Sequence, residues 1–310
     1  LPVKIWIEPT NACNIKCKTC PQSLSHFPPR GMMSVDLMQK IVDELKVIQP
    51  TLVTLHMAGE PMMHNKIDKL VRMAKTTGAP VTISTNGLLL TQDKIDGLIE
   101  AGLDDMRIDF AADKSVYELI RCQSSWHTVY ENIRILLETK KRRDTAKPIL
   151  TLINIDVSPD NRQTLENLSR LRYLFDGYPF QTANLDIHTW AGEFAKEHTR
   201  NDPIFQVRTA ESLVQAKYFP CIHLYGSFNI SWNGDVLPCC RDLMKEYVIG
   251  NVADQSIVSL WNSDRLLALR RKHALKRHHE IPLCKNCDQV FRSHNLMNVV
   301  KKTMGRMFVH

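Results

Sequence analysis

Three cysteines near the start of the chain constrain its fold and chemistry more than any other feature. Cys13, Cys17 and Cys20 follow a short apolar run at residues 3–7, with three and then two residues between successive thiols. Three thiolates on one short loop can each ligate one iron of a cubane [4Fe-4S] cluster and leave the fourth iron open for chemistry. A structural zinc site prefers two pairs of ligands, so we favour a cluster over a zinc knuckle or buried apolar thiols.

The composition bounds the class of protein. With 310 residues, 44% of them apolar, the chain can bury the core of one large domain or of two smaller ones. It has neither an apolar run of membrane-spanning length nor a signal peptide in residues 1–20. We therefore expect a cytoplasmic protein without a membrane span, whose nine cysteines are metal ligands or free thiols. The net charge of +7 comes largely from residues 140–143 and 270–279, and without interleaved aromatics it is typical of solvated surfaces rather than of a nucleic-acid site.

Short apolar runs alternate with helical patterns as far as about residue 195. The expected strands are residues 3–8, 52–57, 80–84, 106–110, 150–157 and 184–188. The expected helices between them are residues 34–48, 66–76, 91–101, 127–140 and 162–175, with Ser34 as the N-cap of the first. This alternation predicts parallel βαβ units. We therefore expect an α/β fold, a partial (β/α)6 barrel of the TIM type, with a doubly wound sheet as the alternative.

The residues best suited to chemistry all come just after these strands. A Gly-Glu-Pro segment at residues 59–61 follows the second strand, and Thr-Asn-Gly at residues 85–87 follows the third. Asp109 closes the fourth strand, and residues 188–192 follow the sixth. In a β/α barrel the carboxyl ends of the strands form one mouth, where such proteins place their active sites. The sequence therefore predicts one site that combines these segments with the cysteine loop.

Together these segments resemble the radical S-adenosylmethionine (radical SAM) enzymes. The matching features are the three-cysteine loop, the Gly-Glu-Pro motif and the Ser-Thr-Asn-Gly strand end at residues 84–87. The resemblance implies that the open iron chelates the amino and carboxylate groups of SAM. It makes Arg121 a partner for the carboxylate, since a guanidinium can bind a carboxylate through two parallel hydrogen bonds. The cofactor-binding residues that it implies are Gly59, Glu60, Pro61, Ser84, Asn86 and Arg121.

Two positions depart from the pattern of this family. Thr19 stands before the third cysteine, where an aromatic or large apolar residue often lies beside the adenine. Arg107 stands where a small hydroxyl residue is common. Ile153 and Trp190, at expected strand ends, are the candidates for adenine contacts instead. For Trp190, packing in the core is the competing interpretation.

A second group of cysteines lies beyond residue 200. Residues 228–232 and 235–238 flank Asn233-Gly234, a dipeptide that favours a two-residue hairpin turn, and a helix is expected at residues 257–275. Four cysteines around these elements could fully ligate a second centre, either [4Fe-4S] or zinc: Cys221, Cys239, Cys284 and Cys287. Adjacent side chains diverge along a strand, so Cys240 is left over.

This second region resembles the SPASM/twitch extension of radical SAM enzymes, which carries auxiliary iron–sulfur clusters. The resemblance includes the hairpin, residues 238–242, Gly250-Asn251 and Leu260-Trp261. The cysteines suffice for one auxiliary cluster, as in the shorter, twitch-type form. The implied parts are a radical SAM barrel at residues 1–200, an auxiliary domain at residues 201–290 and a basic amphipathic tail at residues 291–310. We expect the tail to dock on its own domain or on a second subunit rather than on a membrane.

The resemblance implies that one electron splits SAM into methionine and a 5'-deoxyadenosyl radical, which takes a hydrogen atom from an unactivated carbon. The chain begins directly at the first strand, without the leader-binding domain of many peptide-modifying relatives. We therefore expect a small-molecule substrate such as a sugar or an aminocyclitol. The first expectation is dehydrogenation, with the auxiliary cluster as electron acceptor and Asp109, Glu193 or His188 as proton acceptor.

Three different functions stay open beside dehydrogenation. In an epimerase the thiol of Cys122 or Cys240 would return a hydrogen atom to the opposite face of the substrate, and burial as a small hydrophobic residue competes with that role for both. The second is a peptide-modifying maturase, and the third is a non-catalytic metal-binding module. For the enzyme, a flavodoxin- or ferredoxin-type electron donor is implied, and the positive net charge fits an acidic redox partner. The sequence does not indicate an oligomeric state.

Overall fold

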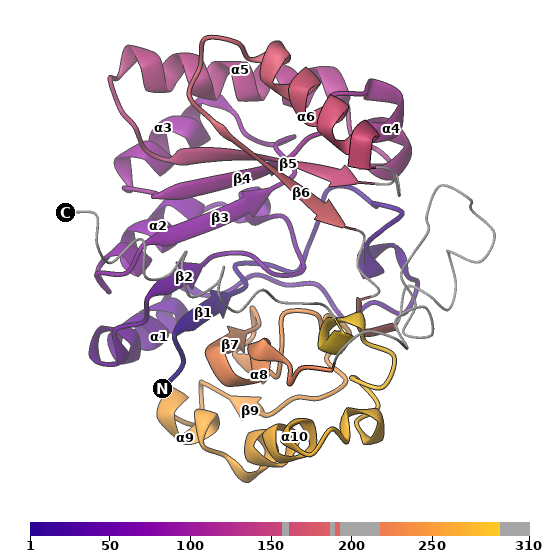
Figure 1. Ribbon diagram of the computed structural model, residues 1–310. Helices are drawn as coiled ribbons and strands as arrows, with labels where there is room; N and C mark the ends of the chain where they lie inside the picture. The colour runs from indigo at the N-terminus through magenta and orange to yellow at the C-terminus, as the bar shows by residue number, and fades with distance from the viewer. Residues whose placement is uncertain (157–160, 187–189, 193–217, 292–310) are drawn as a thin grey trace.

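Figure 1 shows the computed structural model, which describes residues 1–156, 161–186, 190–192 and 218–291. Its centre is a nine-stranded sheet in the order β6-β5-β4-β3-β2-β1-β7-β8-β9. Strands β1 to β6 pair in parallel with their neighbours in the chain. Their bounds are β1 (Lys4–Ile7), β2 (Leu52–Thr54), β3 (Val81–Thr85), β4 (Asp105–Asp109), β5 (Ile149–Asp156) and β6 (Gln181–Asp186).

Helices connect the consecutive strands of this parallel part. They are α1 (Val35–Ile48), α2 (Ile67–Lys75), α3 (Gln92–Glu100), α4 (Lys114–Ile120), α5 (Trp126–Arg142) and α6 (Asn161–Leu174). Because the strand order never reverses, right-handed crossovers put these helices on one face of the sheet. A doubly wound sheet would reverse its order at a switch point, so the expected partial (β/α)6 barrel is confirmed. No described helix is both long enough and apolar enough to cross a membrane.

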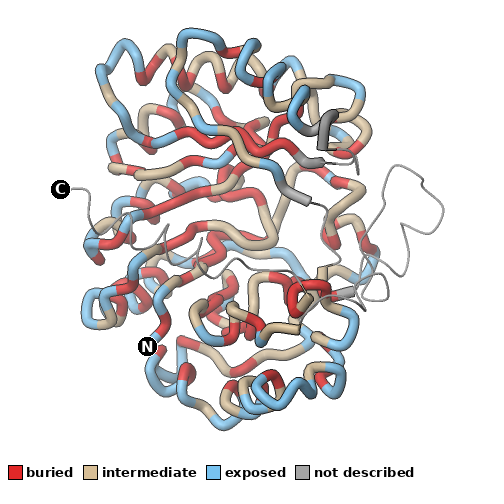
Figure 2. The backbone as a smooth tube through the Cα atoms, viewed as in Figure 1, coloured by how far each residue is buried: buried red, intermediate tan, exposed pale blue. Residues whose placement is uncertain are grey.

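The two faces of the sheet differ in polarity. Ile5, Val53 and their counterparts on the other strands are fully buried in the apolar core, and Figure 2 shows this buried centre between more exposed helix surfaces. Side chains alternate along a strand, so the intervening residues point to the opposite face, which we call the inner face. One row of inner-face residues is polar and aligned across neighbouring strands: Trp6, Thr54, Thr82 and Asp105.

The predicted hairpin is present and extends the same sheet. Its turn has three residues, 232–234, rather than the two expected, because Ser231 pairs with Asp235 through a hydrogen bond from Ser231 N to Asp235 O. Its strands are β7 (Ser227–Ile230) and β8 (Asp235–Leu237), and the short β9 (Gly250–Asn251) pairs with β8. Strand β7 also pairs in parallel with β1. The sequence did not indicate this contact, because no local pattern marks a pairing between strands so far apart in the chain. The domain bounds at residues 200 and 290 stay predictions, since residues 193–217 and 292–310 lie outside the described residues.

The predicted helices and strands lie within a few residues of the observed ones, with three exceptions. The short helix α8 (Ile222–Gly226) was not predicted. Helix α4 was not predicted; Asp113 begins it by accepting hydrogen bonds from two backbone N–H groups of its first turn. The single helix expected at residues 257–275 is wrong. The chain forms α9 (Ile257–Trp261) and α10 (Asp264–Ala274), because the Ser263 side chain accepts a hydrogen bond from Leu266 N and starts a new helix. Ser34 caps α1 as expected, accepting from Leu37 N.

The hairpin turn generates a prediction about stability. Gly234 has φ +90°, and a Cβ added there would lie 2.6 Å from Asn251 Oδ1. Gly78 has φ +78° but nothing within 4 Å of such a Cβ. Gly78→Ala should therefore cost only left-handed backbone strain, about 1–2 kcal/mol, and Gly234→Ala should cost more. Thermal unfolding of both variants checks this; equal losses would contradict the role given to the Asn251 contact.

Candidate functional site

The cysteine loop lies directly against the Gly-Glu-Pro segment that follows β2. A Cβ on Gly59 would lie 2.1 Å from the carbonyl oxygen of Thr10 and 2.6 Å from that of Ala12, so only glycine allows this approach. Glu60 N donates a hydrogen bond of 2.8 Å to the Ala12 carbonyl, immediately before Cys13. The first ligand candidate is therefore held at a fixed distance from the end of β2.

Gln22 holds the other end of the loop. It lies in the short helix η1 (Pro21–Ser23), two residues after Cys20, and its side chain is buried. Its Nε2 donates to the carbonyls of Asn11 at 2.7 Å and Ala58 at 2.6 Å. Sequence reasoning missed this residue, because a glutamine beside a cysteine motif carries no distinctive signal.

Glu60 joins the Gly-Glu-Pro segment to the end of β3. Its carboxylate accepts hydrogen bonds from Thr85 Oγ1 at 2.6 Å, Asn86 N at 2.7 Å and Met62 N at 3.0 Å. The side chain is 2% exposed, and burial raises its pKa above the usual range although these donors favour the ionised form. Two of the predicted motifs are thus brought together by one buried carboxylate.

The segment after α4 holds the middle of the cysteine loop. Two backbone hydrogen bonds join them, Lys18 N to Ile120 O at 3.0 Å and Lys16 N to Cys122 O at 3.4 Å. Trp190 adds a contact from the end of the barrel, since its Nε1 donates to the Thr19 carbonyl at 2.7 Å. Trp190 and Cys122 therefore both lie at the cysteine loop, and the role predicted for each stays a prediction.

The three thiols of the loop suit a metal centre. Cys17 is buried, and Cys13 and Cys20 are half-buried. Burial raises the pKa of Cys13 to about 11 and that of Cys20 to about 12, and the neighbouring Cys17 raises both. Such thiols become thiolates only beside a compensating positive charge, which a bound metal centre supplies. Hydrogen-bond donors lie near the sulfurs, with Arg121 Nη1 at 3.3 Å from Cys17 Sγ and Asn86 Nδ2 at 4.0 Å from Cys13 Sγ.

Arg121 also contacts the end of β4. Its Nη2 forms an ion pair of 2.7 Å with Asp109 Oδ2. Burial alone would lower the pKa of Arg121, but Asp109 and Cys17 raise it above its usual range. The residue predicted to bind a carboxylate and the residue predicted to accept a proton are therefore paired with each other, which spacing in the sequence did not indicate.

Four of the remaining cysteines are near neighbours. Cys221 precedes α8 (Ile222–Gly226), Cys239 follows β8, and Cys284 and Cys287 follow the short helix η5 (His278–Glu280). Burial raises the pKa of Cys221 to about 12 and also raises those of Cys239 and Cys284, and each of these three is raised further by others of the four. Burial also raises the pKa of Cys240, the charges of Arg241 and Lys4 lower it, and Cys240 in turn raises the pKa of Cys239. That Cys240 is left out of the second centre stays a prediction.

A buried ion pair holds the segments that carry these thiols. Arg241 Nη1 lies 2.9 Å from Asp288 Oδ1, and both side chains are at most 8% exposed. The pair joins the chain just after β8 to the residue that follows Cys287. Separating the two side chains would leave two buried charges without a partner, which is unfavourable. The ion pair therefore keeps the two segments close together.

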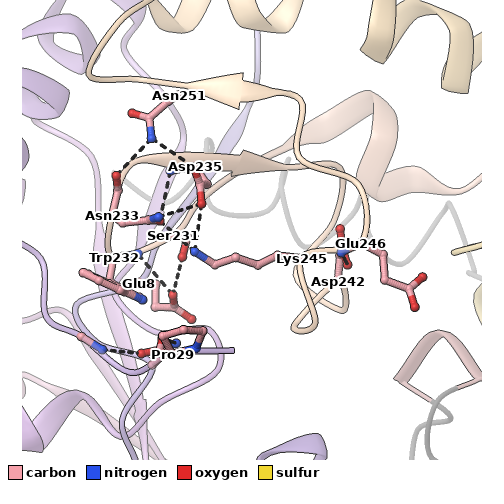
Figure 3. A network of polar contacts seen from close by, with 12 residues as sticks. Glu8, Pro29, Ser231, Trp232, Asn233, Asp235, Asp242, Lys245, Glu246 and Asn251 are labelled. Carbon is pink, nitrogen blue, oxygen red and sulfur yellow. Dashed lines mark hydrogen bonds and ion pairs between the residues drawn. The ribbon is translucent and has the colours of Figure 1, made fainter. Parts of the chain in front are cut away.

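Glu8 couples the two cysteine regions (Figure 3). Its carboxylate accepts hydrogen bonds from Ala58 N at 3.0 Å on one side and from Ser231 Oγ at 2.8 Å and Trp232 N at 3.2 Å on the other. The side chain is 1% exposed, and burial raises its pKa above the usual range. Sequence reasoning did not select Glu8, although a carboxylate directly after an apolar strand is a signal that could have found it.

The hairpin turn also packs on the cysteine loop. A Cβ on Gly31 would come within 2.3 Å of the Trp232 ring, so the ring lies flush against the backbone there. Asn11 fixes this part of the loop, because its Nδ2 donates to Pro29 O at 2.9 Å and its Oδ1 accepts from Gly31 N at 2.8 Å. The auxiliary region therefore contacts the loop that carries the first three thiols.

The other predicted residues are placed as follows. Pro61 begins the short helix η2 (Pro61–Met63), Ser84 lies on β3 of the inner face, and Ile153 lies on β5 in register with Asp109. His188 and Glu193 lie outside the described residues. Among the residues that the structure describes, no three His, Cys, Asp or Glu side chains are set to hold a single metal ion.

Comparison with protein families gives two matches. Residues 7–172 match the radical SAM superfamily, and residues 221–288 match SPASM, an iron–sulfur cluster-binding domain. Together the matches identify the cofactors as SAM and [4Fe-4S] clusters, one at the radical SAM site and one auxiliary.

Two curated relatives cover most of the chain. A tungsten-containing aldehyde ferredoxin oxidoreductase cofactor-modifying protein from Pyrococcus furiosus is 24% identical over 91% of this chain and 86% of its own length. The S-adenosyl-L-methionine-dependent 2-deoxy-scyllo-inosamine dehydrogenase from Niallia circulans is 23% identical over 92% of each chain.

Solved structures share the fold. BtrN in complex with AdoMet and 2-DOIA superposes with a TM-score of 0.62 at 20% identity, covering 94% of both chains. Streptococcus suis SuiB bound to the precursor peptide SuiA superposes with a TM-score of 0.67 at 15% identity, covering 96% of this chain and 73% of SuiB. At these identities the likeness supports the partial barrel and no particular activity.

The contact at Gly59 generates a prediction about metal content. Gly59→Ala should push residues 59–61 away from the cysteine loop and abolish one cluster, lowering iron from about eight to about four atoms per chain after anaerobic reconstitution, at four irons per cubane. Gly97→Ala in α3 is the matched control, because its nearest neighbour would be the Asp68 side chain at 3.4 Å. Iron analysis checks both variants. A Gly59→Ala protein with the wild-type iron content would show that the close approach does not position the loop.

Proposed function

Because the chain belongs to the radical SAM superfamily, we propose that it dehydrogenates an alcohol carbon of a small molecule of the sugar or aminocyclitol type. The observation that carries this proposal is that the first group has three cysteines and the second has four. Three thiols leave one iron of a cubane open for SAM, whereas four thiols saturate the auxiliary cluster and leave it fit to accept an electron. The similarity over 92% of both chains to 2-deoxy-scyllo-inosamine dehydrogenase supports the substrate type.

When bound, SAM and the first [4Fe-4S] cluster would supply the radical chemistry that removes a hydrogen atom from the substrate carbon. The chain must hold the ligands and exclude water. We assign Cys13, Cys17 and Cys20 as the ligands of the first cluster. The hydrogen bonds of residues 12, 16 and 18 fix this loop against β2 and α4.

The SAM-binding residues that we propose are Gly59, Glu60, Pro61, Ser84, Asn86, Arg121, Ile153 and Trp190. Because the Glu60 carboxylate is filled by donors from residues 62, 85 and 86, we give it a positioning role and assign amino-group contacts to the backbone of its motif. Arg121 has five N–H donors, so its contacts with Asp109 and Cys17 leave capacity for the SAM carboxylate.

Oxidation of an alcohol to a ketone removes one hydrogen atom, one proton and one electron. For the auxiliary cluster, which would accept the electron, we assign Cys221, Cys239, Cys284 and Cys287 as ligands. Asp109 is the proton acceptor that we propose, since it lies at the end of β4 beside Arg121 and hence beside the cysteine loop. A flavodoxin- or ferredoxin-type protein would return one electron to the first cluster.

Epimerisation is the second candidate, and the placement of Cys240 favours it. Cys240 lies within electrostatic reach of Lys4 on β1, so its thiol could face a substrate on the inner face. Cys122 is the alternative hydrogen donor; its Sγ donates to the Leu119 carbonyl at 3.6 Å. A peptide substrate, as in the SuiB complex, remains the third candidate.

The proposal is tested with the full chain reconstituted anaerobically with iron and sulfide. With dithionite and SAM, 5'-deoxyadenosine should form, and an aminocyclitol or sugar substrate should yield one ketone per 5'-deoxyadenosine. An epimerase would instead incorporate deuterium from D₂O at the reacting carbon without net oxidation. If no substrate or reductant gives 5'-deoxyadenosine, the chain is not a radical SAM catalyst of this kind.

The adjacent thiols at the end of β8 give a matched test of the ligand assignment. Cys239→Ala should lower iron from about eight to about four atoms per chain, because a cubane cluster needs its fourth ligand. Cys240→Ala should retain the full iron content, since its thiol is assigned to no cluster. The measurement is iron and sulfide per chain with the electron paramagnetic resonance spectrum of the reduced protein. Equal losses in both variants would refute the assignment.

A further inference from the structure

A group of hydrogen-bond donors lies on the inner face and has no part in the cluster sites. Lys4 and Trp6 point to the same side of β1, and His56 follows β2. Arg107 is in register with Ser84, on the same face. These four side chains, Lys4, Trp6, His56 and Arg107, are called the inner-face donor group.

Three members of this group are linked by contacts through the Trp6 ring, and the charge of Arg107 acts on Lys4 and His56. Lys4 Nζ lies 4.1 Å from the centre of the Trp6 ring, and the Trp6 and His56 rings meet edge to face at 4.9 Å. Burial lowers the pKa of His56 to about 3, and the charges of Lys4 and Arg107 lower it further. His56 is therefore a neutral imidazole at physiological pH, between two cations.

The polar atoms that these residues present are donors. His56 Nδ1 accepts a hydrogen bond of 3.1 Å from Ser84 N, so the neutral ring carries its proton on Nε2. Trp6 Nε1 is buried and has no hydrogen-bond partner among the described residues. Lysine and arginine only donate. A group that offers donors and no acceptor is complementary to an anion.

The acidic residues that the structure describes do not fully balance the positive charges of the inner-face donor group. In the described part of the chain Lys4 forms no ion pair with an acidic residue, and Arg107 has only a contact of 3.4 Å with Asp105. Burial lowers the pKa of Lys4 to about 8, with Cys240 opposing and Arg107 adding to the shift, so the ammonium form still prevails at neutral pH. The Arg107 side chain is 45% exposed and those of Lys4 and His56 are half-buried, so a ligand can reach them.

We propose that the inner-face donor group binds an anionic group of the substrate, a carboxylate or a phosphate, an assignment that rests on the proposed function for the location of the substrate. Two further polar atoms in the row of Trp6 lack partners among the described residues, Thr54 Oγ1 and Asn229 Oδ1. They suit a ligand hydroxyl beside the anion. Because the bound group is an anion, the substrate that we propose is a sugar phosphate or a sugar acid.

The test is isothermal titration calorimetry of the anaerobic holoenzyme at low ionic strength, with inorganic phosphate and malonate as probes. The wild type should bind at least one of them saturably with a stoichiometry near one. Lys4→Met and Arg107→Gln should each weaken that binding by about tenfold or more, as expected for hydrogen bonds to a charged group. Tighter binding of phosphate than of malonate indicates a sugar phosphate, and the reverse order indicates a sugar acid.

Lys46→Met is the matched control, because Lys46 lies exposed on α1 in an ion pair with Asp43 and carries the same charge. It should leave the affinity for both anions unchanged. If Lys4→Met weakens anion binding because the positive charge is lost, Lys4→Arg should restore the binding. Arg107 is more exposed, so Arg107→Gln tests the same site even if a substitution at Lys4 disturbs folding. No saturable binding of either anion, or an equal loss in Lys46→Met, overturns the proposal.

The same preparation separates this proposal from the proposed function. If the wild-type protein forms 5'-deoxyadenosine but binds neither anion, the proposed anion site is refuted and the proposed function is not. If the protein binds an anion through Lys4 and Arg107 but never cleaves SAM, the proposed function is refuted and the proposed anion site is not.

Discussion

The contact on which the rest of the site depends is the approach of residues 59 and 60 to the backbone of residues 10–12. It brings two main chains together with no side chain between them, and a hydrogen bond from Glu60 N closes it. Because backbone atoms set the distance, the cysteine loop has little freedom relative to β2. The three thiols are therefore held in position before a cluster binds. Cluster binding then has to ligate the iron but does not also have to order the loop.

Two buried carboxylates extend this arrangement through the molecule. Glu60 gathers donors from the end of β3, and Glu8 gathers donors from the segment after β2 and from the hairpin turn. Burying a carboxylate is unfavourable, which is why the pKa of each is raised. The hydrogen bonds offset that cost, and loss of either carboxylate would leave several buried donors without an acceptor. One carboxylate therefore holds the first site together, and the other joins it to the auxiliary region.

The sequence predicted those features that leave a local pattern. Strand and helix periodicity, the Ser34 cap, the presence of a hairpin at Asn233-Gly234 and the strand-end motifs each depend on neighbouring residues. The pairing of Arg121 with Asp109 and the role of Glu8 depend on contacts between distant segments, and residue type alone does not reveal them. The break before α10 was missed because a serine inside an amphipathic pattern can either continue a helix or cap a new one. Glu60 was predicted to bind SAM, yet its carboxylate accepts hydrogen bonds from protein donors.

The pairing of β7 with β1 has a consequence for folding. Without residues 227–230, the backbone N–H and C=O groups along one side of β1 would be left as a bare sheet edge. Bare edges template association with other chains and so favour aggregation. During synthesis, β1 emerges long before the strand that covers it, so the nascent barrel must pass through an interval in which that edge is open. The protection of β1 thus comes from a segment that the ribosome makes only after all the strands of the barrel.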